Sequence, residues 1–167
     1  SKELFVRDTT VIKQSDNLYT AEVSENWSIG NTANGGYSMT LAAKAMSEFL
    51  EHKDPLSISA HYLDRVDFGS TEFHVTHLSS SKSLSTARVE LIQDNKIKII
   101  FVGTFTDFSF KNDMNIYERD VPNFPEYNSC EVIPYKEGFN PKLDKNIEKA
   151  YAQDSLWWKK DIDNSSS

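Results

Sequence analysis

Hydrophobic residues recur at three- and four-residue spacing from Gly36 to about Glu51. The apolar positions of this stretch are Met39, Ala42, Ala43, Ala45, Met46, Phe49 and Leu50. This spacing places the side chains on one face of an α-helix, and Pro55 prevents the helix from continuing. Because small Ala side chains cover much of its surface, other structure can approach closely. We therefore expect this helix to be central in the fold.

Apolar and polar residues alternate in the segments that follow, as in Thr71–Leu78, where Phe73 and Val75 have polar neighbours. A period of two is typical of a strand with one buried face. The expected strands after the helix are Leu56–Leu63, Thr71–Leu78, Ser83–Gln93 and Lys96–Phe108, and an earlier hairpin joins Thr10–Gln14 to Leu18–Val23. Asp94-Asn95 predicts a two-residue hairpin turn, and such short connections require antiparallel neighbours.

A long helix followed by antiparallel strands predicts an α+β fold, in which the sheet wraps around the helix so that both bury their apolar faces. We assign residues 1–110 to this domain. Residues 111–167 include Pro122, Pro125 and Pro134. They are expected to form an irregular segment with a short helix over Leu143–Lys160 and a linker-like tail.

Length and composition restrict the class of protein. The 167 residues, 38% of them hydrophobic, suit one packed core, and no apolar run approaches the roughly 18 residues of a membrane span. Cys130 is the only cysteine, which excludes an internal disulfide and a cysteine-based zinc cluster. The first residues show no targeting pattern, so we expect a cytoplasmic location, with an organelle lumen as the alternative.

Several short motifs occur in a characteristic order. They are Asn34-Gly35-Gly36-Tyr37 before the alanine-rich helix, His61-Tyr62-Leu63 before Gly69, Ser83 to Val89, and Ile92-Gln93 before Thr104-Phe105. In order and spacing they resemble the first repeat of the tandem hot-dog acyl-CoA thioesterases, the acyl-CoA thioesterase II type and its fungal thioesterase-like relatives. The resemblance covers about Trp27 to Phe108. Each motif by itself is weak evidence for the family, and the signal comes from their order.

The resemblance implies a hot-dog fold and hydrolysis of fatty acyl-CoA thioesters by water, without a metal or redox cofactor. Members of this family carry two hot-dog repeats in a chain nearly twice as long. The implied partners are therefore acyl-CoA and either a second copy of the chain or a second hot-dog repeat.

Thioester hydrolysis needs hydrogen-bond donors at the developing oxyanion, which the free amides of a helix's first turn can supply. We predict the Gly36 and Tyr37 amides as these donors, with Asn34 and Gly35 beside the substrate. In the alternative interpretation, the glycines only form the turn into the helix and Asn34 is its N-cap.

The remaining candidate residues lie on the predicted strands. The resemblance implies a role for Gln93, because the matching Gln in the second repeat of relatives helps to position the attacking water. Ser83 and Ser85 share one strand face and could line a pocket. For these three residues, an exposed polar position on a strand is the alternative.

The net charge of −7, with no long basic cluster, argues against nucleic acid as a partner. A polyanion such as coenzyme A could still bind locally, because Lys82, Arg88, Lys96 and Lys98 lie on one predicted hairpin. An ordinary solvated hairpin edge explains these residues equally well.

A catalytic acid is missing from the expected place. Relatives carry an Asp about one and a half turns into the helix of the second repeat, where this chain has Leu41. Glu48 lies twelve residues beyond Gly36, about 18 Å along a helix and too far to act there. Asp64 and Asp67, near a strand end, are the other carboxylates considered as bases.

Two functions therefore remain open. The first is an acyl-CoA hydrolase whose catalytic acid lies outside this chain. The second is a non-catalytic half that binds an acyl ligand or completes a catalytic repeat elsewhere. A dehydratase of the same fold is a weaker third possibility, because residues 31–37 offer neither a His nor an Asp.

Overall fold

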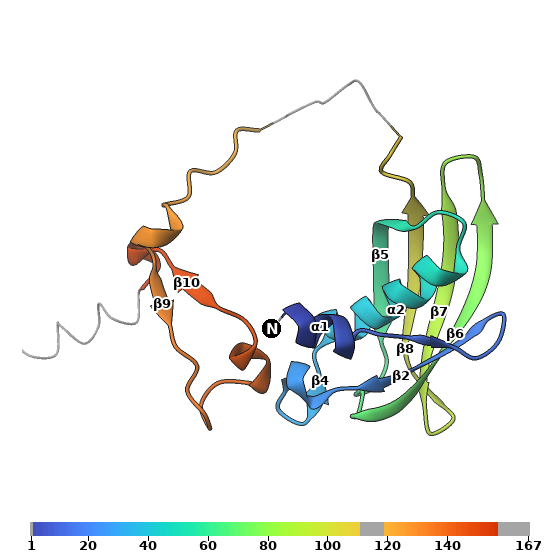
Figure 1. Cartoon of the computed structure of the whole chain (residues 1–167), viewed down its shortest axis with the longest axis horizontal. Helices are drawn as coiled ribbons and strands as arrows, with labels where there is room; N and C mark the ends of the chain where they lie inside the picture. Colours follow the sequence, from blue (N-terminus) through green and yellow to red (C-terminus); the bar gives the residue numbers. More distant parts are fainter. Residues whose placement is uncertain (1, 111–118, 157–167) are drawn as a thin grey trace, which may run out of the picture. The chain divides into compact units, whose positions relative to one another are not determined.

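The computed structural model describes residues 2–110 and 119–156, which fall in two compact units (Figure 1). Unit 1 is Ser1–Lys111 and unit 2 is Asn112–Ser167. In the described part of the chain, no helix is long and apolar enough to cross a membrane.

Unit 1 holds two α-helices and most of the strands. Its elements are α1 (Lys2–Asp8), β1 (Ile12–Lys13), β2 (Leu18–Val23), a 3-10 turn (Glu25–Trp27), β3 (Ser28–Ile29), β4 (Thr32–Ala33), α2 (Gly35–Phe49), β5 (Asp54–Tyr62), β6 (Gly69–Ser80), β7 (Ser85–Gln93) and β8 (Lys96–Thr106). Six strands form one sheet in the order β1-β2-β6-β7-β8-β5, and every neighbouring pair is antiparallel. Figure 1 shows α2 lying across the concave face of this sheet. The predicted α+β architecture, with a sheet around one central helix, is confirmed.

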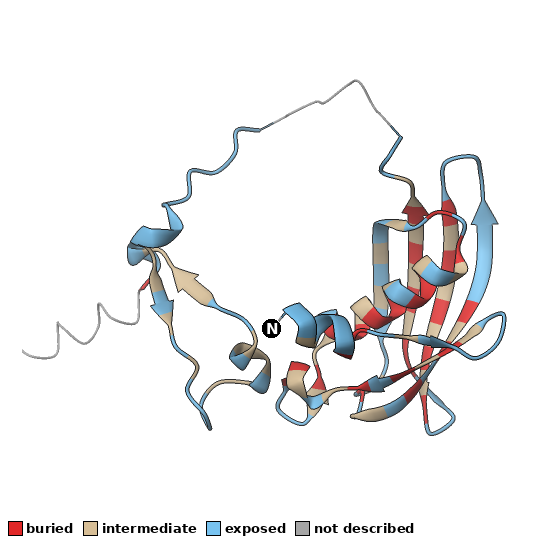
Figure 2. Cartoon of the chain, in the orientation of Figure 1, coloured by how far each residue is buried: buried red, intermediate tan, exposed pale blue. Residues whose placement is uncertain are grey.

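Small residues let α2 approach the sheet closely. Ala42, Ala45 and Met46 of the helix are fully buried, and Figure 2 shows the buried residues where helix and strands meet. Gly103 of β8 lies beneath Met46, since a Cβ atom at this glycine would come within 2.7 Å of the Met46 sulfur. The predicted turn at Asp94-Asn95 is present, with the positive φ angles of 50° and 59° that a type I′ hairpin requires.

Two local predictions need correction. The strand expected at Thr10–Gln14 is only the two-residue β1, and α1, which sequence analysis missed, precedes it. The prediction of a helix over Leu143–Lys160 is wrong for residues 143–156, the part that the structure describes. Unit 2 has instead 3-10 turns at Tyr127–Ser129, Lys142–Lys145 and Gln153–Ser155 and an antiparallel pair, β9 (Glu131–Ile133) with β10 (Lys149–Tyr151). Pairing with the distant β9 satisfies backbone groups that a helix would have satisfied locally. Residues 157–160 of that helix, and the predicted tail, lie outside the described residues.

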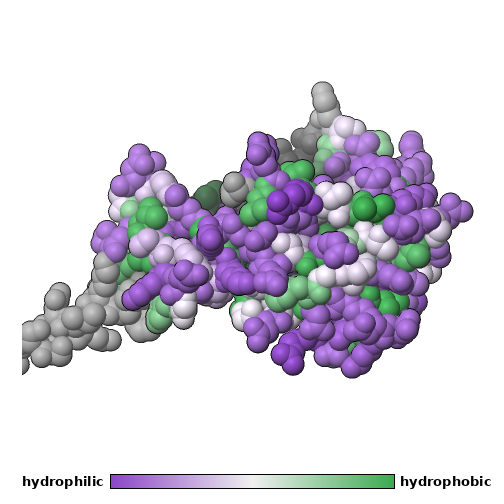
Figure 3. Space-filling model, turned by 60° about the horizontal axis from the view of Figure 1, so that its bottom comes forward, coloured by the Kyte–Doolittle hydropathy of each residue, from purple (hydrophilic) through white to green (hydrophobic). Residues whose placement is uncertain are grey.

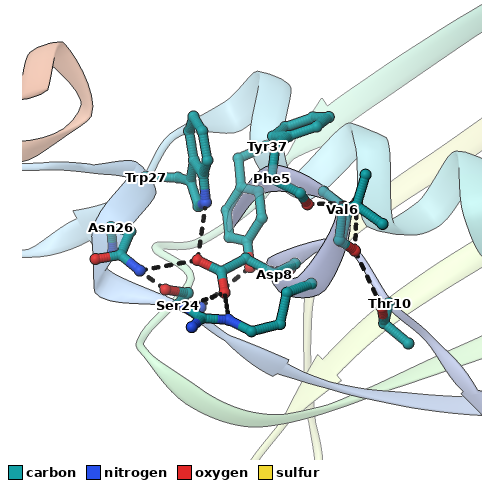
Figure 4. Close-up of polar contacts among 10 residues, drawn as sticks. Phe5, Val6, Asp8, Thr10, Ser24, Asn26, Trp27 and Tyr37 are labelled. Carbon is teal, nitrogen blue, oxygen red and sulfur yellow. Dashed lines mark hydrogen bonds and ion pairs between the residues drawn. The ribbon is translucent and has the colours of Figure 1, made fainter. Parts of the chain in front are cut away.

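The α1 helix is attached to the rest of unit 1 through Asp8 (Figure 4). The Asp8 side chain is 5% exposed and pairs with Arg7 at 2.8 Å. Its carboxylate accepts hydrogen bonds from Trp27 Nε1 at 3.1 Å and Asn26 Nδ2 at 2.9 Å. Burial raises the pKa of Asp8, but hydrogen bonds from its side-chain partners lower it by more, so this pKa lies below its ordinary value.

Replacing this carboxylate should weaken the fold in a pH-dependent way. Because the pKa of Asp8 is lower in the folded than in the unfolded chain, its stabilisation is present above about pH 4 and lost as the pH falls through the folded value. We expect Asp8→Asn to lower the free energy of unfolding by about 2 kcal/mol at pH 7. The loss should be smaller at pH 3. Urea unfolding followed by circular dichroism measures both.

Asp16→Asn is the matched control, because Asp16 is fully exposed and only 4.0 Å from Lys13. It should change the free energy of unfolding by less than about 0.5 kcal/mol. An Asp8→Asn variant as stable as this control at pH 7 would contradict the role given to Asp8.

Candidate functional site

A hollow of about 310 Å³ lies at the N-terminus of α2. We call it the entrance hollow. Gly35 and Ser38 line it from the first turn of α2, and Tyr62 lines it from the end of β5. The segment after β5 contributes Asp64 and Arg65. The hollow thus combines the start of the helix with the end of an edge strand.

Asn34 is the residue that starts the helix. Its side-chain oxygen accepts hydrogen bonds from the Gly36 amide at 2.8 Å and the Tyr37 amide at 3.2 Å. Its own amide donates to the Trp27 carbonyl at 2.9 Å. The N-cap interpretation of Asn34 is confirmed. The two amides predicted as oxyanion donors therefore already have an acceptor, which a substrate carbonyl would have to share or displace.

The Gly35 amide, unlike the Gly36 and Tyr37 amides, does not donate to the Asn34 side chain. Within residues 2–110, the amide of Gly35 makes no hydrogen bond, as is usual for the first residue of a helix. Its carbonyl accepts a hydrogen bond from the Tyr62 hydroxyl at 3.1 Å. A Cβ atom at Gly35 would lie 3.0 Å from the Tyr62 ring. A side chain at this position would crowd the ring against the helix, so Gly35 and Tyr62 together shape the hollow.

Tyr62 is the site residue that sequence analysis missed. It belongs to the His61-Tyr62-Leu63 motif, but no local pattern indicates that its hydroxyl reaches a helix 27 residues away in sequence.

The side chain of Tyr37 has a structural role besides the role predicted for its amide. Its side chain is buried, and its hydroxyl donates to the Asp8 carbonyl at 2.6 Å while accepting from the Ser24 amide at 3.1 Å. Figure 4 shows these groups beside Trp27, whose ring centroid is 6.2 Å from that of Tyr37. Through these two hydrogen bonds, the Tyr37 side chain connects the start of α2 to α1 and to the residue that follows β2.

Gln93 is not among the residues that line the entrance hollow. It is buried, and its side chain is occupied by three hydrogen bonds. Its oxygen accepts from the Asp67 amide at 2.9 Å, and its nitrogen donates to the Asp67 carbonyl and the Thr71 hydroxyl, both at 2.8 Å. Gln93 thus fixes the loop between β5 and β6, part of which lines the hollow.

The structure does not bring Ser83, Ser85 and Arg88 to the hollow. Ser83 precedes β7 and is exposed, so it shares no strand face with Ser85. Ser85 is buried and lies 2.5 Å from the Nδ1 atom of His52, which follows the C-terminal end of α2. Arg88 pairs with Glu90 at 3.0 Å. The side chains of Ser85 and Arg88 therefore have local structural partners.

The basic residues of the β7–β8 hairpin do not form one patch. Lys82 precedes β7, where its carbonyl contacts His52. Lys96 and Lys98 lie at the other end, near the turn, with ammonium groups 2.7 Å and 3.4 Å from the Asp64 carboxylate. The length of the intervening strand separates the two groups, roughly 26 Å at 3.3 Å per residue.

Asp64 is the carboxylate that lines the hollow. Hydrogen bonds from the Lys96 ammonium, the Arg65 amide and the Lys98 ammonium hold the pKa of Asp64 well below its usual range. A carboxylate with so low a pKa is a weak proton acceptor. Among the described side chains, no group of three or more His, Cys, Asp or Glu residues is arranged to hold a metal ion.

Comparisons with solved structures identify the fold. A protein from Thermobifida fusca assigned as a thioesterase II is 20% identical over 91% of this chain and 57% of its own, with a TM-score of 0.79. An acyl-CoA thioesterase II from Mycobacterium marinum is 15% identical over 78% of this chain and 52% of its own, with a TM-score of 0.62. This chain therefore spans little more than half the length of these relatives.

A shorter protein is matched over nearly its whole length. A mutant of a phenylacetic acid degradation protein from Thermus thermophilus is 24% identical over 59% of this chain but 91% of its own, with a TM-score of 0.51. No curated protein matches the sequence.

The family model for the acyl-CoA thioesterase N-terminal domain matches residues 23–107. These residues run from the end of β2 to just past β8 and so include the helix, the long strands of the sheet and the whole entrance hollow. With an antiparallel sheet around one helix, and solved thioesterases of the same fold, the chain belongs to the acyl-CoA thioesterase N-terminal domain family.

Proposed function

We propose that this domain binds an acyl-CoA thioester in the entrance hollow, with the thioester carbonyl at the first turn of α2. The observation that carries the proposal concerns Gly35, a residue that lines the hollow and whose amide makes no hydrogen bond within residues 2–110. Amides at a helix N-terminus favour a partially negative oxygen. The family membership supports a thioester as the ligand.

The neighbouring amide supplies the second donor. Gly36 carries no side chain, and the only atom close to a Cβ at this position would be the Asn34 oxygen, at 3.1 Å. A carbonyl bound at Gly35 can therefore also reach the Gly36 amide once Asn34 shares it. Two donors aimed at one oxygen are the arrangement that stabilises a tetrahedral intermediate.

Hydrolysis also needs a base for the attacking water. The ion pairs of Asp64 make it a weak base, and Leu41 is fully buried at the position where relatives carry an Asp. We propose that the base comes from a second hot-dog domain. The alternative function, a half that binds the acyl ligand without hydrolysing it, uses the same hollow and differs only in this step.

The edge of the sheet offers a place for that second domain. β5 is the last strand in the sheet order and has only β8 as a neighbour within the described residues. Leu56, Tyr62 and Leu63 are exposed along and just after it. An open edge with apolar side chains favours pairing with another chain. Because Tyr62 also lines the entrance hollow, pairing at β5 would bring the partner close to the bound thioester.

A side chain at Gly36 should block binding. We expect Gly36→Val to weaken the affinity for a non-hydrolysable acyl-CoA analogue at least tenfold, because the branched side chain covers the first-turn amides. The space at Gly36 is otherwise open, so the free energy of unfolding should change by less than about 1.5 kcal/mol. Isothermal titration calorimetry and urea unfolding test the two statements.

Thr40→Val is the matched control, since Thr40 lies one turn further along α2 and its hydroxyl donates to the Gly36 carbonyl, at 2.9 Å. It should bind the analogue as the unsubstituted chain does. A folded Gly36→Val variant with unchanged affinity would show that the glycine serves only the turn.

The isolated chain should release thiol slowly from acyl-CoA. A positioned general base contributes roughly 10²–10⁴-fold, and an oxyanion donor alone about 10²–10³-fold. Asp64→Asn should change the rate of thiol release by less than about twofold, because this carboxylate is too weak a base. The assay uses medium and long acyl-CoA substrates. Rapid turnover that disappears in Asp64→Asn would place the base within this chain.

A further inference from the structure

Arg65 lies in the loop between β5 and β6 and lines the entrance hollow. Among the described residues, its guanidinium makes no hydrogen bond or ion pair. Arg7 and Arg88, the other arginines of unit 1, each pair with a carboxylate, at 2.8 Å and 3.0 Å. Hydrophilic residues, in purple, cover most of the coloured surface in Figure 3. The missing partner, and not exposure, therefore distinguishes Arg65.

The loop that carries this arginine is held on both sides of it. Before Arg65, the Asp64 amide donates to the Lys98 carbonyl at 3.0 Å. After it, the Gln93 side chain bonds to the amide and the carbonyl of Asp67, at 2.9 Å and 2.8 Å. The backbone at Arg65 is thus fixed before a ligand arrives, which reduces the entropy lost on binding.

The carboxylates on either side of Arg65 pair with lysines and not with the arginine. The Asp64 carboxylate lies 2.7 Å from the Lys96 ammonium and 3.4 Å from the Lys98 ammonium. The Asp67 carboxylate lies 3.9 Å from Lys98. These pairs leave the guanidinium free for a ligand, and they compensate negative charge that would otherwise repel an anion.

The chemistry of the guanidinium indicates which part of the proposed ligand it meets. Its planar fork of donors matches the oxygens of a phosphate or a carboxylate. In an acyl-CoA with an unsubstituted acyl chain, the pantetheine arm and the acyl chain are uncharged, and the negative charge lies on the phosphates.

The length of the pantetheine arm is compatible with such a contact. The arm is about as long as four extended residues, roughly 14 Å. Tyr62, whose hydroxyl bonds to Gly35 at the start of α2, precedes Arg65 by three residues, up to about 10 Å of chain. The long side chain of Arg65 adds to this reach.

We infer that Arg65 binds a phosphate at the end of the pantetheine arm of the thioester. The inference rests on the proposed binding of the thioester carbonyl at the first turn of α2. It gives Arg65 the role that sequence analysis considered for the basic residues of the β7–β8 hairpin. The domain thereby favours thioesters whose carrier bears phosphate over those whose carrier does not.

Isothermal titration calorimetry with the full chain tests the inference. One non-hydrolysable acyl analogue is used in three forms, carried on coenzyme A, on phosphopantetheine and on pantetheine, which has no phosphate. Arg65→Gln should weaken the affinity for the coenzyme A form at least tenfold, because charge-assisted hydrogen bonds are lost. It should change the affinity for the pantetheine form by less than about twofold, because that form offers no anion to the guanidinium.

Lys13→Gln is the matched control for the change in net charge. It removes one positive charge from β1, at the opposite edge of the sheet from β5. Its affinities for all three forms should equal those of the unsubstituted chain.

The phosphopantetheine form identifies the phosphate that is bound. If Arg65→Gln weakens this form as much as the coenzyme A form, Arg65 contacts the phosphate that both carry. If only the coenzyme A form is weakened, it contacts one of the others, and either result supports the inference.

Two outcomes would overturn the inference and leave the proposed function in place. Equal weakening of the coenzyme A and pantetheine forms would show that Arg65 only shapes the hollow. An unchanged affinity for the coenzyme A form would show that its phosphates lie elsewhere. An unsubstituted chain that binds none of the three forms would instead reject the proposed function, and this inference with it.

Discussion

The α2 helix lies against the sheet at a distance set by residues that have almost no side chain. Ala42 and Ala45 face the strands, and Gly103 leaves room for Met46. Because the interior is packed to the density of a solid, larger side chains here would push the layers apart. The position of the helix in turn determines where its first turn opens to solvent, beside the end of β5. The entrance hollow is thus a consequence of core packing.

The start of α2 is held from several directions at once. Asn34 caps it, Tyr62 lies against Gly35, and the Tyr37 hydroxyl bonds to α1 at Asp8. The last of these contacts comes from outside the family match, which begins at residue 23. The first-turn amides are therefore kept in place before a ligand arrives, which reduces the entropy lost on binding. In the proposed function, a substrate carbonyl would have to compete with Asn34 for the Gly36 amide.

Charge around the hollow favours binding over proton transfer. Two lysines stabilise the ionised Asp64, and this removes its basicity while leaving cationic side chains near the hollow. In the function that we propose, the domain binds and polarises a thioester but depends on another group to activate water. We propose that this group comes from a second hot-dog domain paired at the exposed edge of β5.

The sequence by itself determined the helix, the long strands, the Asp94-Asn95 turn and the wrapped α+β fold, because these depend on side-chain periodicity and on glycine, proline and turn chemistry within short windows. Only the tertiary structure decided which polar groups meet. The Tyr62 hydroxyl reaches Gly35 across 27 residues, Gln93 reaches Asp67 across 26, and His52 reaches Ser85 across 33. Such contacts have no local signature, since chain folding brings together partners that are distant in sequence. The β9–β10 pair escaped prediction for the same reason, because strand pairing satisfies backbone groups between segments and not within one.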